Sequence, residues 1–217
     1  MKISKKTIII TSILTLLPVV FGLVMWDKLP NPMPTHFGAD GVADGWSDKS
    51  FGVFGLPLIM LGAHLLCIFA SKTDPKSGNY SEKLFALIVW LVPVLSILAD
   101  GAMYAYALGV TVDITMLVMV FTSVLFIVIG NYLPKCKHNY TMGVKLPWTL
   151  ADENNWNATH RLAGYTWMLG GVVLLVNSFF FNMYVFLAVV LVMTLIPCIY
   201  SYMFYRKHGV AENKEEE

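Results

Sequence analysis

The chain has 217 residues, of which 57% are hydrophobic and only 13% are charged, and its mean hydropathy is +0.64. A soluble domain carries about a quarter charged residues, so this composition excludes an ordinary soluble protein and predicts a membrane protein. The formal net charge of +1 gives no indication of direct nucleic-acid binding.

Six apolar stretches are each long enough to cross the hydrocarbon of a bilayer, which takes about 20 helical residues. The first follows the basic segment MKISKK, but its apolar run is too long for a signal peptide and no small-residue cleavage site follows it, so it is interpreted as a retained signal anchor. The last two are separated by Asn182 and its neighbours and are predicted to form a tight helical hairpin. The predicted spans are Thr7–Trp26, Phe51–Ala70, Leu84–Leu108, Val112–Tyr132, Leu162–Phe181 and Met183–Tyr205.

Basic residues predict the orientation, because Lys and Arg are enriched in the cytoplasmic segments of membrane proteins. With the N-terminus in the cytoplasm, only Lys28 and Lys49 of the 15 Lys and Arg residues fall outside. Both termini are therefore predicted to be cytoplasmic, with residues 206–217 as a solvated acidic tail. The predicted cytoplasmic residues are Lys2, Lys5, Lys6, Lys72, Lys76, Lys83, Lys135, Lys137, Lys145, Arg161, Arg206, Lys207 and Lys214.

The expected fold is an all-α membrane protein, a six-helix transmembrane bundle that forms a single membrane domain over residues 1–217. Two long polar segments interrupt the apolar pattern. Residues 27–50, here called loop 27–50, are predicted to form a structured outer loop. Residues 133–161, here called the signature loop, are predicted to form a cytoplasmic re-entrant or interfacial loop that is too long for a simple connector.

Loop 27–50 has the composition of a shaped cap over the outer end of the bundle. Prolines at every second position from Pro30 to Pro34 favour an extended run, and glycines between Gly38 and Gly45 permit tight turns. A calcium-loop pattern beginning at Asp40 fails, because its third and twelfth positions are not carboxylates. The polar groups are therefore predicted to bond to turns and to hold no metal. The candidate binding residues of this loop are His36, Phe37, Asp40 and Asp44.

The signature loop includes most of the stretch GNYLPKCKHNYTMGVKLPWTLADENNW, residues 130–156. Its lysines suit the anionic inner surface of a membrane, and Trp148 and Trp156 suit the interface. Thr149 is predicted to cap a helix that begins at Leu150 and continues through Arg161 into the fifth span. One face of that helix is predicted to carry Asp152, Trp156, His160, Ala163 and Trp167.

His64 and Asp100 are the titratable residues that lie well inside the predicted spans, where charge is costly and often functional. At 1.5 Å per residue, His64 lies about 20 Å and Asp100 about 10 Å from the outer ends of their helices. A direct pair is not expected, and the sequence shows no titratable residue at intermediate depth for a proton relay. The expected arrangement is a neutral His64 bonded to a carbonyl and an Asp100 that faces a wet outer cavity.

Patterns typical of enzymes are missing from the sequence. It has no H-E-x-x-H, G-x-S-x-G, P-loop or G-x-G-x-x-G motif. Cys67, Cys136 and Cys198 stand apart with no C-x-x-C, which predicts neither a disulfide framework nor a cysteine zinc site. No catalytic residue or cofactor is therefore assigned.

Both loops resemble known sequences. The stretch 130–156 is similar to the signature of the SdpI immunity family, in which G-N-x-x-P-K, an Asn, G-x-R-T-P-W-T-L, an acidic pair and a Trp follow one another. LPNPMPTHFGADGVADGWSDK resembles a small domain of unknown function often found ahead of that signature, which opens L-P-x-x-[IVM]-P-x-H-[FW]. Two positions differ: Lys145 stands where Arg is usual and Leu146 where Thr is usual. Lysine keeps the charge but lacks the bidentate fork of arginine.

The resemblance implies a bacterial membrane protein that protects its host from a secreted peptide toxin and also captures a winged-helix repressor at the membrane. On this basis loop 27–50, with His36 and Phe37, meets the toxin, and the segment Asn131–Trp156 presents the repressor-binding surface. The candidate partner-binding residues are Asn131, Lys135, Asn139, Lys145, Pro147, Trp148, Thr149 and Trp156, together with Asp100.

Two other function classes stay open from the sequence alone. A small-solute or ion transporter is suggested by His64, Asp100 and prolines in four spans, although no inverted repeat is visible. A metal-dependent membrane enzyme would use His36 with the aspartates of loop 27–50. The prolines are Pro18, Pro57, Pro93 and Pro197.

Overall fold

The structure, a computed structural model, describes residues 4–80 and 82–215, so Lys2 and the last two residues of the predicted tail lie outside the described residues. The chain divides into two compact units. The N-terminal unit comprises Met1–Thr73 and Ser81–Thr115, and the C-terminal unit comprises Asp74–Tyr80 and Met116–Glu217. The expectation of one domain over the whole chain stays a prediction.

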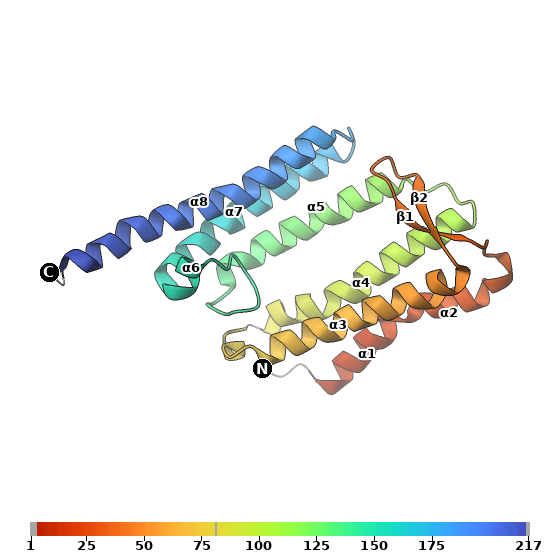
Figure 1. Cartoon of the computed structure of the whole chain (residues 1–217), viewed down its shortest axis with the longest axis horizontal. Coiled ribbons are helices and arrows are strands. Elements are labelled where there is room, and N and C mark those ends of the chain that lie inside the picture. The colour runs from red at the N-terminus through yellow and green to blue at the C-terminus, as the bar shows by residue number, and fades with distance from the viewer. Residues whose placement is uncertain (1–3, 81, 216–217) are drawn as a thin grey trace. The chain divides into compact units, whose positions relative to one another are not determined.

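The N-terminal unit combines helices with a small β-hairpin (Figure 1). Its apolar side chains pack into two clusters, one around Met33, Val53 and Tyr104 and the other around Phe85 and Val89. The first cluster joins the hairpin to the helices. The elements are α1 (Lys5–Thr15), α2 (Leu17–Val24), β1 (Met33–Phe37), β2 (Ala43–Ser47), α3 (Leu56–Thr73) with a π-helical turn before it (Phe51–Gly55), and α4 (Glu82–Ala107).

Pro18 explains why the first predicted span is two helices. Proline has no N–H to continue the helical ladder and its ring crowds the preceding turn, so α1 ends at Thr15 and α2 begins at Leu17. Around the break, the N–H of Val19 donates to the carbonyl of Leu16 at 3.0 Å, a contact one residue shorter than in an α-helix. Pro18 therefore breaks the first predicted span into two helices.

The β-hairpin corrects the expectation of an all-α chain. Strands β1 and β2 are antiparallel, with Met33 opposite Ser47 and Pro34 opposite Trp46. Met33 is fully buried and fixes β1 to the helical core. The prolines obscured the strand in the sequence, yet a two-stranded sheet consists of edge strands, where proline is tolerated.

The C-terminal unit is built from helices that approach one another through glycines. The carbonyl of Gly130 would lie 2.9 Å from a Cβ at Gly164, and a Cβ at Gly170 would overlap Sδ of Met193. Small residues of this kind let membrane helices pack backbone to backbone. The elements are α5 (Ile114–Tyr132, whose first two residues belong to the N-terminal unit), a 3-10 turn (Leu133–Lys135), α6 (Pro147–Ala151), α7 (Glu153–Asn177) and α8 (Met183–Glu215).

Two predictions about these helices have different outcomes. The tight hairpin between α7 and α8 is confirmed: Asn182 Oδ1 accepts from the N–H groups of Tyr184 and Val185 and caps α8. The predicted helix start at Leu150 is wrong. Pro147 opens the short helix α6 instead, and Asp152 then leaves the helical conformation and caps α7 by accepting from the N–H of Asn154 at 2.7 Å.

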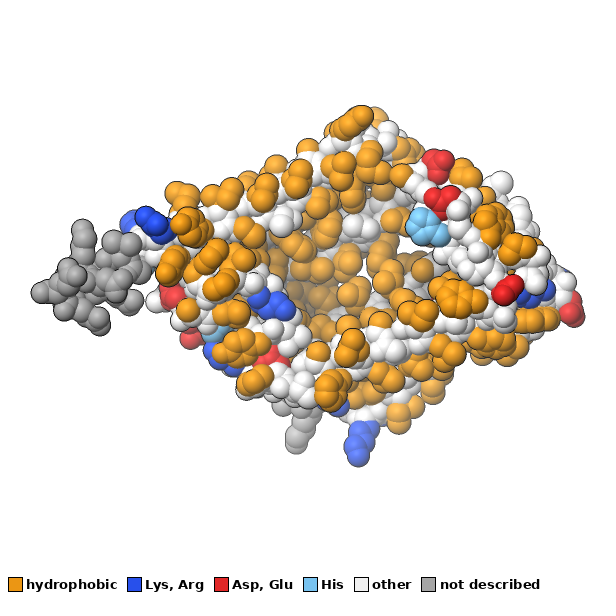
Figure 2. Space-filling model, viewed as in Figure 1, with side chains coloured by type: hydrophobic (Ala, Val, Ile, Leu, Met, Phe, Trp, Pro, Cys, Tyr) orange, Lys and Arg blue, Asp and Glu red, His pale blue; other side chains and the backbone are white. Residues whose placement is uncertain are grey.

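Five helical segments among the described residues are long and apolar enough to cross a membrane. Helix α7 is not among them, because its first turns carry polar side chains, and the predicted span Leu162–Phe181 therefore stays a prediction. Figure 2 shows hydrophobic side chains over much of the helical surface on the face it presents. These features indicate a multi-pass membrane protein. The five segments are Lys5–Val24, Phe51–Thr73, Glu82–Ala107, Ile114–Lys135 and Met183–His208.

Candidate functional site

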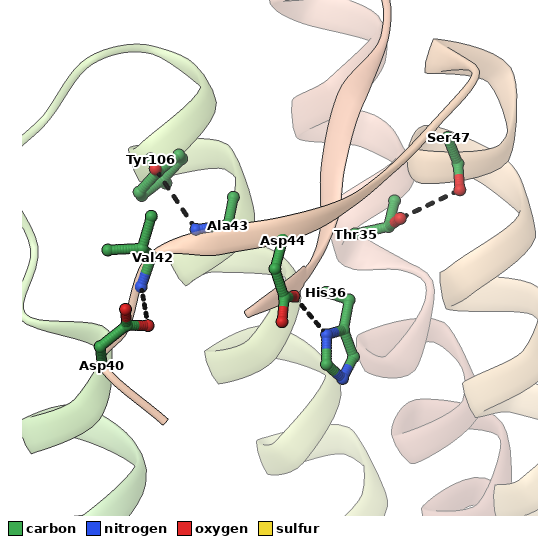
Figure 3. A network of polar contacts seen from close by, with 8 residues as sticks. All are labelled: Thr35, His36, Asp40, Val42, Ala43, Asp44, Ser47 and Tyr106. Atoms are coloured by element: carbon green, nitrogen blue, oxygen red, sulfur yellow. Dashed lines mark hydrogen bonds and ion pairs between the residues drawn. The ribbon is translucent and has the colours of Figure 1, made fainter. Parts of the chain in front are cut away.

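Loop 27–50 brings together two of its candidate residues. The imidazole Nδ1 of His36 in β1 lies 2.5 Å from Oδ1 of Asp44 in β2, and both side chains are largely exposed, at 73% and 55% (Figure 3). Asp40 lies elsewhere, since its Oδ1 accepts from the N–H of Val42 at 3.1 Å within the turn. Among the described residues, no three His, Cys, Asp or Glu side chains gather so that they could hold a metal ion.

Phe37 is partly buried against α4. Its ring meets Tyr106 of α4 edge to face at 5.1 Å, and the Tyr106 hydroxyl accepts from the N–H of Ala43 at 3.4 Å (Figure 3). The hydroxyl of Thr115 donates to the carbonyl of Ala39 at 3.1 Å. The hairpin is thus fixed to the end of α4 by a ring contact and one hydrogen bond, and to the start of α5 by a second hydrogen bond.

Sequence reasoning missed two exposed apolar residues beside the His36–Asp44 pair. Val42 is 54% exposed and Trp46 is 52% exposed. Together with Asp44 they alternate along the exposed face of β2 and its turn, as side chains at every second position of a strand do. The alternation is visible in the sequence VADGW, but the surrounding glycines and prolines favoured reading it as turns.

The signature loop is organised around a residue that sequence reasoning also missed. Asp74, in the segment before α4, is 6% exposed and lies in the C-terminal unit. Its carboxylate accepts from the hydroxyls of Tyr80 at 2.5 Å and Thr141 at 2.7 Å, and from the N–H groups of Lys76 and Tyr140. Burial alone would raise the pKa of Asp74, but these four hydrogen bonds outweigh it and lower the pKa to about 2.

Asn139 shapes the next part of the loop. Its Oδ1 accepts from the N–H groups of Thr141 and Met142, and its Nδ2 donates to the carbonyl of Lys137 and to Sγ of Cys136. The side chain is fully buried and uses both ends of its amide. Burial raises the pKa of Cys136 to about 11, with Asn139 acting in the opposite direction, so the thiol stays protonated at neutral pH. Asn139 therefore acts as a scaffold residue rather than a contact surface.

Trp156 is also part of the scaffold. It is fully buried, its Nε1 donates to the carbonyl of Cys136 at 2.8 Å, and its ring stacks on His160 at 3.9 Å. His160 Nδ1 donates to the carbonyl of Trp156, and its Nε2 accepts from the N–H of Val144 at 3.0 Å. This arrangement assigns a neutral imidazole, in agreement with a pKa that burial lowers to about 4.

His138 is the part of the signature loop that keeps an unused polar atom. Lys76 Nζ lies 2.7 Å from His138 Nδ1, and Asn79 Nδ2 donates to the His138 carbonyl. An ammonium group can only donate, so Nδ1 is the acceptor and the ring proton of a neutral His138 is on Nε2. Within the described part of the chain, this buried Nε2 has no hydrogen-bond partner.

Helix α6 displays the remaining candidates. Trp148 is partly buried, and its Nε1 donates to the hydroxyl of Ser201 in α8 at 2.9 Å. Its ring contacts Tyr202 and Tyr205, also in α8. Thr149 is fully buried, and its hydroxyl accepts from the N–H of Leu146 at 2.9 Å, which closes the first turn of α6.

The predicted residues of the signature loop therefore divide by exposure. Asn139, Thr149 and Trp156 are buried and hold the loop in shape, whereas Trp148 is intermediate. The exposed group lies on the surface of the C-terminal unit. Its members are Asn131, Lys135, Lys145 and Pro147.

Asp100 and His64 are both buried in the N-terminal unit, at 3% and 0% exposure, and do not bond to each other. Asp100 Oδ2 accepts from Ser96, and His64 Nε2 lies 3.0 Å from the hydroxyl of Thr11. The predicted partner of His64 was a carbonyl and is instead this hydroxyl. The wet outer cavity predicted for Asp100 is at odds with its burial.

Comparisons with known proteins match both loops. Residues 135–201 match the model of the SdpI/YfhL protein family, and residues 13–61 match a domain of unknown function (DUF1648). The chain is 25% identical to "Immunity protein SdpI" of Bacillus subtilis (strain 168) over 205 residues, which cover 93% of this chain and 97% of that protein. No solved structure matches. The signature, the family match over residues 135–201 and the similarity along nearly the whole chain together support the resemblance to the SdpI/YfhL protein family.

Proposed function

We propose that this protein is a membrane immunity protein that protects the cell carrying it from a secreted peptide toxin. The observation that carries the proposal is the similarity to Immunity protein SdpI over 93% of the chain, which includes both structured loops. In this proposal both termini and the signature loop are cytoplasmic, and loop 27–50 faces the outside. The distribution of Lys and Arg supports that orientation.

Loop 27–50 is the proposed toxin-facing surface. It offers exposed apolar groups, Val42 and Trp46, beside the exposed charges of His36 and Asp44. An amphipathic peptide presents the same mixture of apolar and charged groups. The contacts of the hairpin with Tyr106 and Thr115 hold this surface in one shape, which reduces the entropy lost when a peptide binds.

The signature loop is the proposed cytoplasmic docking surface, with a winged-helix repressor as its partner. Its buried polar network supports this role. Asp74 accepts four hydrogen bonds and Asn139 forms hydrogen bonds through both its amide oxygen and its amide nitrogen, which is more structure than a simple connector needs. The rigid frame holds Lys135 and Lys145 exposed. These two lysines favour an acidic patch on the partner.

A protection assay tests the first part of the proposal. The protein is produced in a Bacillus subtilis strain from which the gene for Immunity protein SdpI has been deleted, and this strain is grown beside its toxin-secreting parent. We expect survival to be restored, and to be reduced when Trp46 and Val42 are both replaced by Ser. A protein that inserts at normal levels yet gives no survival contradicts protection against that toxin.

Cysteine labelling tests the orientation. In a variant without its natural cysteines, an impermeant thiol reagent applied to intact cells should label Ser47→Cys and leave Asn154→Cys unlabelled until the membrane is opened. Labelling of Asn154→Cys in intact cells would reverse the proposed orientation, and with it the sides assigned to the two loops.

A further inference from the structure

The break between α1 and α2 exposes a backbone carbonyl to the interior of the N-terminal unit. In a continuous helix the carbonyl of Thr15 would accept from the N–H of Val19, but Val19 donates to Leu16 instead. The hydroxyl of Ser96 in α4 lies 3.0 Å from that carbonyl oxygen and donates to it. Since Ser96 is fully buried, this is a hydrogen bond formed away from water.

The same Ser96 hydroxyl also lies 3.0 Å from Oδ2 of Asp100. A hydroxyl has one proton to donate, while two acceptors compete for it: the Thr15 carbonyl and the Asp100 carboxylate. If Asp100 carries a proton, the conflict disappears, because Asp100 donates to Ser96 and Ser96 donates to Thr15. If Asp100 is ionised, Ser96 satisfies the carboxylate and the carbonyl loses its donor.

The surroundings of Asp100 supply no compensating charge. Among the described residues, no Lys, Arg or His forms an ion pair with it, and Tyr104, one turn further along α4, is its titratable neighbour. Of the elements packed on α4, α2 has no titratable residue, and His36 of β1 pairs with Asp44. The other titratable groups of these elements are exposed or bonded elsewhere: Lys5, Lys6, Cys67 and Lys72 are exposed, and His64 bonds to Thr11.

We propose that Asp100, Ser96 and the Thr15 carbonyl form a proton-binding site at the helix break of the N-terminal unit. The ligand is a proton taken from water, which forms an O–H bond at Asp100 Oδ2 and is returned to water on release. Burial of an unpaired carboxylate in a membrane protein is costly, so the protonated form is the one that this geometry satisfies completely.

A row of buried hydroxyls continues from this site, yet it does not make a proton wire. The Thr15 hydroxyl donates to the carbonyl of Thr11, and the Thr11 hydroxyl contacts His64 Nε2. Each link from Ser96 to Thr11 passes through a backbone carbonyl, which accepts hydrogen bonds but carries no exchangeable proton. The structure therefore supports a local site at Asp100 rather than a path from Asp100 to His64.

Infrared difference spectroscopy of the full-length protein in lipid nanodiscs tests the site, with the proton itself as the probe. We expect a carboxylic-acid C=O band that disappears as the pH is raised. The band should be absent in Asp100→Asn and present in the control Asp48→Asn, whose carboxylate is exposed. If Asp100→Asn fails to insert, Asp100→Glu serves instead, with aspartate isotopically labelled in both proteins. The label should shift the band of the wild-type protein but not the band of Asp100→Glu, because the carboxyl group at position 100 is then an unlabelled glutamate.

Two substitutions distinguish the proposed competition from a structural role. Ser96→Ala removes the donor to the ionised carboxylate, so the pH at which the band disappears should rise by about one unit. Pro18→Ala restores an N–H and allows Val19 to bond to Thr15, which frees Ser96 for the carboxylate, so that pH should fall. A band assigned to Asp100 that is unmoved by both substitutions overturns the proposal, as does the absence of any Asp100 band from about pH 4 to about pH 9.

Discussion

The carboxylate of Asp74 accepts a hydrogen bond from the hydroxyl of Thr141 at 2.7 Å, although 67 positions separate the two residues in the chain. Through this bond and the one from the Tyr140 N–H, the short segment before α4 becomes part of the signature loop. The shape of the loop therefore depends on a residue outside its own sequence.

Replacing Asp74 should loosen the signature loop. In Asp74→Asn the side chain loses its charge, and one acceptor oxygen is replaced by an NH₂ group. The NH₂ group can only donate, yet the groups around it are also donors, so at least one buried hydrogen bond is lost at a cost of about 1–3 kcal/mol. We expect faster amide hydrogen exchange across residues 137–144 in the detergent-solubilised protein. The exposed Asp48→Asn serves as the control, and equal exchange in the two variants would show that Asp74 does not organise the loop.

His160 gives the signature loop a dependence on pH. Its pKa is lowered to about 4, chiefly by burial, from an ordinary value of 6.5. A group whose folded-state pKa is depressed binds more protons when unfolded, so its contribution to stability is complete above about pH 6.5 and is lost as the pH falls toward 4. Protonation would also place a second donor against the N–H of Val144.

We therefore expect the Tm of the wild-type protein to fall between pH 6.5 and pH 4, and to fall less in His160→Gln. His208→Gln is the matched control, because His208 is an exposed histidine of the same C-terminal unit. The measurement is thermal unfolding followed by tryptophan fluorescence at several pH values. An identical slope in wild type and His160→Gln would assign the pH dependence to other groups.

Replacing the two tryptophans of the signature loop by alanine should cost different amounts of stability. Trp156 is fully buried, so Trp156→Ala leaves a cavity and costs about 3–5 kcal/mol. Trp148→Ala removes a half-buried ring and one hydrogen bond to Ser201, so it should cost less and leave the unit folded. Thermal unfolding of both variants, with protein level in the membrane, checks the order, and equal losses would contradict it.

The sequence was sufficient for the features that depend on local pattern. Five of the six predicted apolar runs coincide with described helices long and apolar enough to cross a membrane, and the short gap at Asn182 predicted the α7–α8 turn. The resemblance of the signature stretch led to the SdpI/YfhL family, which the comparisons support. Each of these features is encoded in one contiguous stretch of the chain, so it can be predicted from a single sequence.

The features that were missed depend on contacts between distant segments. Asp74 looks like a turn residue until Thr141 and Tyr140 are brought against it. Ser96 is one hydroxyl in an apolar run, and only the helix break at Pro18 gives it a carbonyl to satisfy. Helical spacing alone does not show which buried hydroxyl faces which neighbouring helix, because that depends on tertiary packing.

Substitution in the turn of loop 27–50 should be more damaging than substitution of its exposed charged residues. Gly41 has φ +75°, and a Cβ there would lie 2.8 Å from Oγ1 of Thr115, so Gly41→Val imposes backbone strain and displaces the hairpin. His36→Ala removes only an exposed pair, which contributes about 0–1 kcal/mol to stability. We expect Gly41→Val to reduce both protection in the survival assay and the Tm, whereas His36→Ala reduces protection alone.

Gly109→Val is the control for strain without crowding, since Gly109 has the same φ and its Cβ would meet nothing within 4 Å. Full protection by Gly41→Val would show that the shape of the hairpin is not needed for function.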